Sequence, residues 1–368
     1  MLLIQCKRDD LLEPLQSVSG IVEKHHTLAI LSNVLMTKSG EDLTLLSTDI
    51  EIQIKTRAKG RLGDEDVAVT TGARKLQDIL RALPEDADVS VSIDEKKLTV
   101  KAGKSRFSLQ TLPPEDYPRM AVTDSNPVSL ELAQGQLKRL LGLVQYAMAQ
   151  QDIRYYLNGL LLVVAENELR LVATDGHRLA YCRQQLSEGV APMEAILPRK
   201  TVQELTRLLG DADDPVVMSL AGNQVMFRFG AIELTSKLID GKFPDYERVI
   251  PEKTTKQVRL GRIALLRSLQ RAAIVTSEKF RGVRLVLTAG NLRIASTNTE
   301  HEEAQEEIDV EYAGEPIDIG FNVGYLLDVL NNVSGEEVEC HLSDANSSAL
   351  FTLPGNQNFK YVVMPMRV

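Results

Sequence analysis

The chain has 368 residues, of which 43% are hydrophobic and 25% are charged, and its formal net charge is −9. This is ordinary globular composition, and the length predicts more than one domain. No early segment has the basic, apolar and small-residue regions of a signal peptide, and no apolar run approaches the roughly 20 residues of a membrane span. We therefore expect a soluble, cytoplasmic protein.

The first third of the chain predicts two helices and several strands. Leucines at helical spacing between positions 11 and 18 follow two aspartates and predict the first helix, and a second helix is expected over 74–82. Strands follow, with alternating apolar residues. They are expected at 88–93, 97–101 and 105–111.

The middle and last thirds repeat this order of elements. Apolar residues at 3–4 spacing predict helices at 137–144 and from Leu265 to Leu269, and further helices are expected over 199–209 and 323–331. Runs rich in Val, Ile and Leu predict strands between the two helices of each third. These strands include 160–164, 168–172 and 284–288.

One strand-and-turn pattern occurs three times. The segments ending at Asp49, Asp175 and Asn298 each alternate apolar residues and close with Thr-Asp or Thr-Asn, 126 and 123 residues apart. Units of this size bury their own core, unlike solenoid repeats, whose periods run roughly 20–50 residues. We predict an α+β fold of three repeated domains, each with two helices packed on antiparallel sheet. Their expected bounds are 1–125, 126–254 and 255–368.

Several short motifs suggest chemistry without completing it. Gly103-Lys104-Ser105 ends like a phosphate-binding loop, but Leu98 stands where the first glycine is required. Asp175 and His177 could serve a hydrolase or transferase, but no nucleophile motif accompanies them, and a turn explains the segment better. The cysteines lack metal-ligand spacing and predict free core thiols: Cys6, Cys182 and Cys340. We predict no catalytic residue, metal or cofactor.

Charge is distributed unevenly along the chain. The hairpin at 97–109 carries Lys97, Lys101, Lys104 and Arg106, whereas residues 300–311 include seven carboxylates. A basic edge in the first domain and an acidic edge in the last are complementary, and a head-to-tail contact that closes forms a ring. Lys and Arg also recur on the helices, which predicts a local basic surface despite the negative total.

Five motifs give the chain a specific resemblance. They are Gln150–Gly159, Ala173–Ala180, Phe243–Tyr246, Glu278–Gly282 and Tyr361–Arg367. In them, and over its whole length, the chain resembles the bacterial β sliding clamps, the processivity subunits of DNA polymerase III.

The resemblance implies a DNA-clamp architecture and a non-catalytic function. Two chains would join head to tail in a ring, with helices lining the hole, sheets forming the outer wall and duplex DNA passing through. It implies a homodimer that holds DNA without reading sequence. It also implies protein partners: the replicative polymerase subunit, the clamp loader and other proteins that carry clamp-binding peptides.

The resemblance also assigns three sites by position. The residues expected to face DNA are Lys24, His25, Arg74, Gln151, Arg154, Tyr155, Tyr156, Arg199 and Lys200. Those expected to line a peptide groove between the middle and last domains are Leu157, Thr174, Gly176, His177, Arg178, Leu179, Pro244, Val249, Tyr325, Asn346, Ser348, Val362, Met364, Pro365, Met366 and Arg367. Those expected at the dimer interface are Lys75, Lys97, Lys104, Arg106, Phe107, Leu109, Ile274, Val275, Glu300, Glu302, Glu303 and Glu306.

Two positions depart from the family pattern. Lys24-His25 stands in a loop where the family often has an arginine, and Val275 is smaller than the leucine often found there. The second departure predicts a slightly looser dimer.

Two other functions stay open at the level of sequence. One is an enzyme that uses Asp175 and His177, and the other is a static acidic scaffold that never meets DNA. Retention on circular but not linear DNA would separate a clamp from both.

Overall fold

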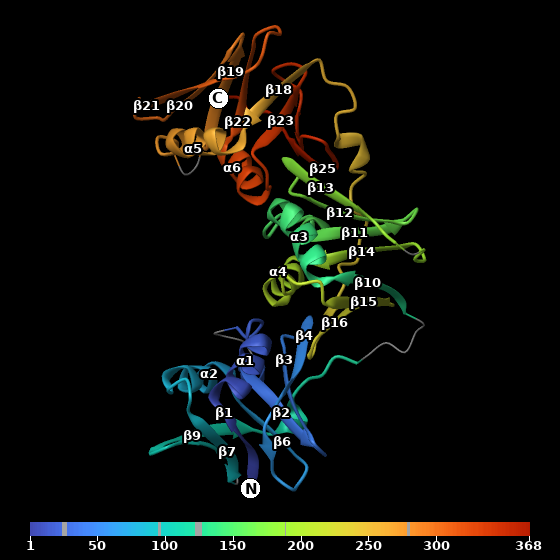
Figure 1. Cartoon of the computed structure of the whole chain (residues 1–368), viewed down its shortest axis with the longest axis vertical. Coiled ribbons are helices and arrows are strands. Elements are labelled where there is room, and N and C mark those ends of the chain that lie inside the picture. Colours follow the sequence, from blue (N-terminus) through green and yellow to red (C-terminus); the bar gives the residue numbers. More distant parts are fainter. Residues whose placement is uncertain (24–27, 95–96, 122–126, 188, 278–279) are drawn as a thin grey trace. The chain divides into compact units, whose positions relative to one another are not determined.

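The computed structural model describes residues 1–23, 28–94, 97–121, 127–187, 189–277 and 280–368 (Figure 1). It comprises two compact units, residues 1–138 with 203–238 and residues 139–202 with 239–368. One element order, β-α-β-β-β taken twice, occurs three times along the chain, with a short extra strand in the first copy. The prediction of three repeats of one α+β fold is confirmed.

The three repeats contain the following elements. The first has β1 (Leu2–Lys7), α1 (Arg8–Ser19), β2 (Asn33–Ser39), β3 (Asp42–Thr48), β4 (Ile52–Ala58), β5 (Arg61–Leu62), β6 (Val67–Gly72), α2 (Ala73–Ala82), β7 (Asp88–Asp94), β8 (Lys97–Ala102) and β9 (Ser105–Leu112). The second has β10 (Val128–Ala133), α3 (Gln134–Val144), β11 (Gly159–Ala165), β12 (Glu168–Thr174), β13 (Arg178–Gln185), β14 (Met193–Pro198), α4 (Arg199–Leu208), β15 (Pro215–Ala221), β16 (Gln224–Phe229) and β17 (Ile232–Lys237). The third has β18 (Lys256–Gly261), α5 (Arg262–Ala273), β19 (Gly282–Thr288), β20 (Asn291–Thr297), β21 (Glu303–Asp309), β22 (Ile317–Asn322), α6 (Val323–Asn332), β23 (Glu337–Leu342), β24 (Ala349–Leu353) and β25 (Asn356–Val363).

Short 3-10 turns occur in the connections. They are η1 (Ala29–Ser32), η2 (Pro114–Asp116), η3 (Gln145–Ala147), η4 (Tyr155–Leu157) and η5 (Glu247–Val249). The helices expected over 74–82, 199–209 and 323–331 and the six expected strands lie within two residues of the observed bounds.

The first unit is built on one thirteen-stranded sheet, in the order β10-β15-β16-β17-β4-β3-β2-β6-β9-β8-β7-β1-β5. Helices α1 and α2 lie together beside its strands (Figure 1). Ala73, Leu76 and Leu80 recur at 3–4 spacing in α2 and are fully buried. That spacing puts all three on one helix face, so their burial docks the helix on the sheet.

The second unit has two sheets. Its eight-stranded sheet runs β14-β11-β12-β13-β25-β24-β23-β18, and its four-stranded sheet runs β21-β20-β19-β22. The middle and last repeats share the larger sheet because β13 pairs with β25, with Leu179 opposite Val362 and Tyr181 opposite Lys360. Successive side chains on a strand point to opposite faces, so these two pairs lie on the same face of the sheet.

The three cysteines are free and buried, as predicted. Burial raises the pKa of the Cys182 and Cys340 thiols to about 12 and, with help from Asp10, that of Cys6 to about 11. All three thiols are therefore protonated at neutral pH and behave as small apolar side chains.

Candidate functional site

The structure describes most of the residues expected to face DNA. Lys24 and His25 lie outside the described residues. Arg74 is exposed at the start of α2, and its Nη2 donates a hydrogen bond to the carbonyl oxygen of Val22 at 2.7 Å. Lys200 is half-buried in α4. Arg74 therefore combines an exposed charge with an anchored guanidinium.

Arg199 has a structural role beside its expected one. Its Nη1 donates to the carbonyl oxygens of Met148 and Ala149, at 3.0 and 3.5 Å. Burial, and then the nearby charge of Arg178, lowers the pKa of Arg199. The guanidinium thus satisfies two consecutive backbone carbonyl groups.

The segment 150–157 is a loop that ends in the turn η4. Arg154 donates two hydrogen bonds to Asp152, from Nε to Oδ1 at 3.0 Å and from Nη2 to Oδ2 at 2.9 Å. These contacts, together with the Arg154 amide, hold the pKa of Asp152 at about 2. Ile153 at the tip is 96% exposed, and Tyr155 is 58% exposed. The fork fixes the loop while its tip stays open to solvent.

An apolar groove opens in the second unit, beside η4, η5 and the pairing of β13 with β25. Its cavity measures about 240 Å³. Ten of the residues predicted for peptide binding line it: Leu157, Thr174, Gly176, His177, Arg178, Leu179, Pro244, Val249, Val362 and Met364. The structure thus brings together residues from four segments far apart in the sequence.

The floor of the groove is apolar and buried, whereas its rim is exposed. Leu179 and Val362 belong to a buried cluster that includes Val172 and Phe243. At the rim, Val249 and Met364 are 46% and 47% exposed. The Met364 amide donates to the His177 carbonyl at 2.9 Å, so the backbone is held while the flexible thioether side chain stays at the exposed rim.

The wall of the groove is a tight turn, and its sequence is the motif repeated along the chain. Asp175 Oδ1 accepts the amides of His177 and Arg178, at 2.9 and 3.1 Å, and Thr174 Oγ1 accepts the amide of Gly176 at 3.0 Å. Gly176 has φ +90°. A Cβ there would lie 3.0 Å from the Arg154 guanidinium. The Asp-Gly-His-Arg segment is therefore a turn whose carboxylate is occupied, as the sequence favours.

The first repeat has the same turn, and the third has a longer turn with the same kind of side-chain contact. Asp49 Oδ1 accepts the amides of Glu51 and Ile52, and Asn298 Oδ1 accepts those of Glu300 and Glu302. Asp and Asn side chains favour such turns because they bond to amides two or three residues on. The repeated Thr-Asp/Asn is thus a repeated structural device rather than a repeated site.

Arg178 ties the groove wall to the rest of the unit. Its side chain is only 9% exposed. Nε donates to Asp175 Oδ2 at 3.1 Å, Nη1 pairs with Asp328 of α6, and Nη2 donates to the Tyr146 carbonyl at 2.6 Å. The guanidinium also lies 4.5 Å from the centre of the Tyr325 ring. Its charge is fully engaged, so Arg178 fixes the shape of the groove.

The remaining residues predicted for peptide binding do not line this cavity. Tyr325 contacts the Arg178 guanidinium with its ring, and the Met366 amide donates to the Gly320 carbonyl at 2.8 Å. The others lie in the β23–β24 loop or at the C-terminal end: Asn346, Ser348, Pro365 and Arg367.

Three residues line the groove without having been predicted for it. Arg154 and Tyr156 were assigned to DNA, and Tyr246 was quoted only as part of a motif. Tyr246 packs its ring against that of Tyr181, with centroids 6.0 Å apart. In the sequence, the signal for Tyr246 was its place in the same motif as Pro244, which was predicted for the groove.

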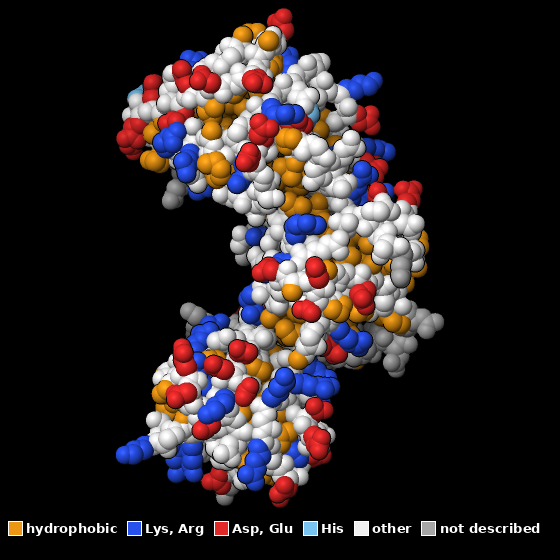
Figure 2. All heavy atoms as spheres, in the orientation of Figure 1, with side chains coloured by type: hydrophobic (Ala, Val, Ile, Leu, Met, Phe, Trp, Pro, Cys, Tyr) orange, Lys and Arg blue, Asp and Glu red, His pale blue; other side chains and the backbone are white. Residues whose placement is uncertain are grey.

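Two strands carry the charge expected at the dimer interface. Among the described residues, the 105–110 part of β9 has β8 as its only neighbour, because β6 reaches only Thr111 and Leu112. β21 is the end strand of its sheet. Figure 2 shows Lys and Arg side chains at the free end of β9, and Asp and Glu side chains gathered over β20 and β21. Both strands therefore leave backbone groups available for pairing.

The residues predicted for that interface are mostly at the surface. Phe107 and Leu109 are half-buried on one side of β9, and Ile274, just after α5, is 80% exposed. Glu306 is half-buried and bound by Arg271, whose Nε donates to Oε1 at 2.8 Å. Val275 is half-buried, and the other charged candidates are exposed: Lys75, Lys97, Lys104, Arg106, Glu300, Glu302 and Glu303.

Two negative findings bear on the described residues. No group of three or more His, Cys, Asp or Glu side chains among them is placed to hold a metal ion. In the same part of the chain, no helix combines the length and the apolar character needed to cross a bilayer.

Three family models match successive parts of the chain. They are those of the DNA polymerase III beta subunit: the N-terminal domain over residues 2–121, the central domain over 131–245 and the C-terminal domain over 247–367.

Similar proteins match over the full length. The "Beta sliding clamp" of Pseudomonas putida is 48% identical, over 98% of this chain and 99% of that protein, and that of Escherichia coli K12 is 43% identical over the same shares. A crystal structure of the DNA polymerase sliding clamp from Pseudomonas aeruginosa has a TM-score of 0.94 at 46% identity, covering 100% of both chains. The chain belongs to the family of bacterial β sliding clamps, the β subunits of DNA polymerase III.

Proposed function

We propose that two copies of the chain close into a ring around duplex DNA and tether the replicative polymerase to it. The observation that carries this proposal is the match to all three clamp domains over the whole chain. The function is binding without catalysis. Its setting is the cytoplasm, and its domains span residues 1–125, 126–254 and 255–368.

Enclosure explains how a protein of net charge −9 holds DNA. Lys and Arg contacts to phosphate are independent of sequence and weaken with salt. A closed ring needs no strong contact, because the duplex leaves only through an end or an open interface. The proposed contacts are Lys24, His25, Arg74, Gln151, Arg154, Tyr155, Tyr156, Arg199 and Lys200, and their weakness permits sliding.

Ring closure uses the two free strand edges. The basic 105–110 edge of one copy meets the acidic edge of β21 in the other, and Phe107 and Leu109 pack against Ile274 and Val275. Strand pairing supplies affinity, while the charges set which edges meet. A head-to-tail contact of this kind closes a ring of two copies.

Partners dock in the groove by an apolar peptide. The floor of Leu179 and Val362 receives apolar anchors, and the Met364 rim adapts to different sequences. The same groove would serve the polymerase subunit, the clamp loader and other proteins in turn.

Retention on circular DNA tests enclosure. The protein is placed on nicked circular plasmid by the loading machinery, isolated by gel filtration, and then treated with an enzyme that linearises the plasmid. We expect retention on the circle and release after linearisation, and retention again when the ends are blocked by bulky proteins. Equal retention on circular and open-ended linear DNA would overturn the proposal and favour a surface-bound scaffold.

A further inference from the structure

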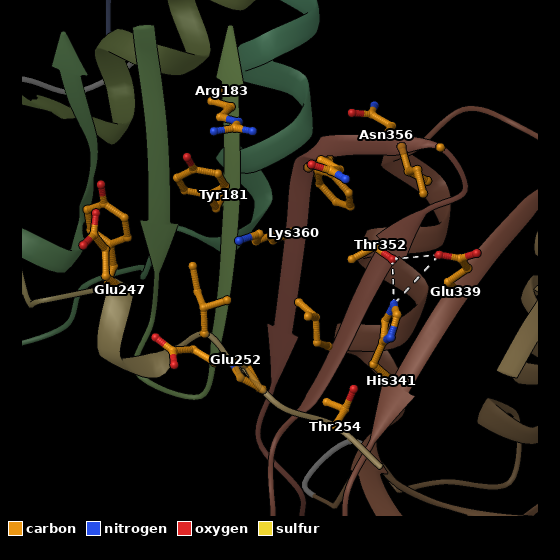
Figure 3. Close-up of a pocket in the computed structure, with 18 residues that line it drawn as sticks. Tyr181, Arg183, Glu247, Glu252, Thr254, Glu339, His341, Thr352, Asn356 and Lys360 are labelled. Carbon is orange, nitrogen blue, oxygen red and sulfur yellow. Dashed lines mark hydrogen bonds and ion pairs between the residues drawn. The ribbon is translucent and has the colours of Figure 1, made fainter. Parts of the chain in front are cut away.

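A second cavity lies in the same unit, beyond the groove. It measures about 800 Å³ and shares one lining residue, Tyr246, with the groove. Figure 3 shows Tyr181, Arg183 and Glu247 on one side of it and Glu339, His341 and Thr352 on the other, with Lys360 between the two groups.

The groove and the second cavity are consecutive along one sheet face. Leu179 and Val362, which oppose each other across β13 and β25, line the groove. Tyr181 and Lys360, the next opposed pair on that face, line the second cavity. Two strand residues span about 7 Å, so an extended peptide seated in the groove reaches the second cavity within two or three further residues.

Most charges at the cavity already have partners. Arg183 pairs with Glu168 at 3.3 Å, and Glu339 with Arg259 at 3.1 Å. Glu247 lies 3.8 Å from Arg170. Arg170 and Arg259 each pair with a further carboxylate, Glu168 and Glu337, so these wall charges are engaged in ion pairs rather than free.

His341 adds no charge to the opposite wall at neutral pH. Its Nε2 lies 2.9 Å from Thr352 Oγ1, which in turn donates to Glu339 Oε2 at 3.4 Å. Burial lowers the pKa of His341 despite the nearby carboxylate of Glu339. That wall therefore offers neutral polar groups.

Lys360 is the exception. Its ammonium lies 5.9 Å from the centre of the Tyr181 ring, and no carboxylate of the described residues lies within 4 Å of it. It is half-buried, whereas Glu252, the remaining charged lining residue, is exposed. A half-buried cation without an ion pair favours an anionic ligand group, because an ion pair offsets the free energy that desolvation of the cation costs.

We propose, on the basis of the peptide groove in the proposed function, that the second cavity extends that groove and receives an acidic residue of the partner peptide. The residue lies two or three positions beyond the apolar anchors, and its carboxylate pairs with Lys360. The cavity therefore discriminates among partners that share the same anchors.

Peptide affinities test the preference for an acidic residue directly. Peptides with one apolar core carry a flexible extension ending in Asp, Asn or Lys, at either terminus, and their affinities are read by fluorescence anisotropy at low salt. At one terminus, we expect Asp to bind about two- to fivefold more tightly than Asn, and Lys more weakly, as for a partly exposed ion pair.

Variants of the clamp assign the effect to Lys360. Lys360→Met keeps the stem against Tyr181 and should abolish the preference for Asp, and Lys360→Glu should reverse it in favour of Lys. Lys256→Met is the matched control, since Lys256 is half-buried in the same unit but lines neither cavity, and it should leave the preference unchanged.

Two results would overturn the inference while the groove stands. One is equal affinity for the Asp, Asn and Lys peptides at both termini, with the unextended core still bound. The other is an unchanged preference for Asp in Lys360→Met. Failure of the unextended core to bind would instead overturn the groove itself. If the variants do not fold, the comparison of peptides on the unaltered protein still decides.

Discussion

Arg178 shows how one side chain serves the groove without being free to bind in it. Its guanidinium is engaged by Asp175, by Asp328 and by the Tyr146 carbonyl, and it stacks on Tyr325. A buried cation requires all of these partners, because an unpaired charge in the interior is costly. In the proposed function, the residue therefore acts on peptide binding through the position of the wall.

Removing one carboxylate partner of Arg178 should lower the free energy of unfolding more than removing a carboxylate partner of a surface arginine. Asp328→Asn should lower the free energy of unfolding by about 1–2 kcal/mol, less than for a fully buried pair because Asp328 is 44% exposed. It should also weaken peptide binding. Urea denaturation and peptide titration give the two readouts.

The chain offers a matched control for that change. Asp318 is 43% exposed, as Asp328 is, but its partner Arg284 is 53% exposed. Asp318→Asn should therefore cost less than about 1 kcal/mol and leave peptide affinity unchanged. Equal losses of unfolding free energy in the two variants would show that the burial of Arg178 does not raise the cost of removing its partner.

At the scale of elements, one turn is used in the first two repeats with different residues at its strained position. The middle repeat places Gly176 at φ +90°, whereas the first repeat places Ile50 at φ +72°. A β-branched residue in the left-handed region costs roughly 1–2 kcal/mol, and glycine does not. Conformational strain is thus relieved in the copy that forms the groove and retained in the first.

Ile50→Asn should stabilise the protein by about 1 kcal/mol, because asparagine tolerates the left-handed conformation. The side chain of Ile50 is 42% exposed, so little buried surface is lost. Ile50→Val keeps the branching at Cβ and serves as the control, with no gain expected. A lower thermal midpoint for Ile50→Asn than for the unaltered protein would refute the strain argument.

Local patterns in the sequence predicted the repeats, whereas the groove residues were predicted by their position in the clamp family. The Thr-Asp/Asn turns and the 3–4 spacing in α2 depend on residues close together in the chain. The placement of Arg154 on the groove depends on the Asp152 fork, and the engagement of Arg178 depends on α6, 150 residues away. Such long-range contacts leave no periodic signal in a single sequence.

At the scale of the whole molecule, the proposed ring closure includes a small apolar contact beside the strand pairing. Val275→Leu adds one methylene, worth about 0.8 kcal/mol if it is buried on closure, and should slow subunit exchange about fourfold. Ile274→Val removes one and should speed exchange by a similar factor. Mixing donor- and acceptor-labelled rings measures both rates, and unchanged or faster exchange in Val275→Leu would count against the proposed interface.

The salt dependence of release from circular DNA tests the central claim most directly. Loaded protein on nicked circles is followed from about 0.1 to about 0.5 M salt, a range over which binding held by phosphate contacts falls by orders of magnitude. The account predicts a lifetime on circles that changes little across this range, with rapid loss from open-ended DNA at every salt concentration. A lifetime on circles that falls as steeply as charge-held binding does would contradict retention by enclosure.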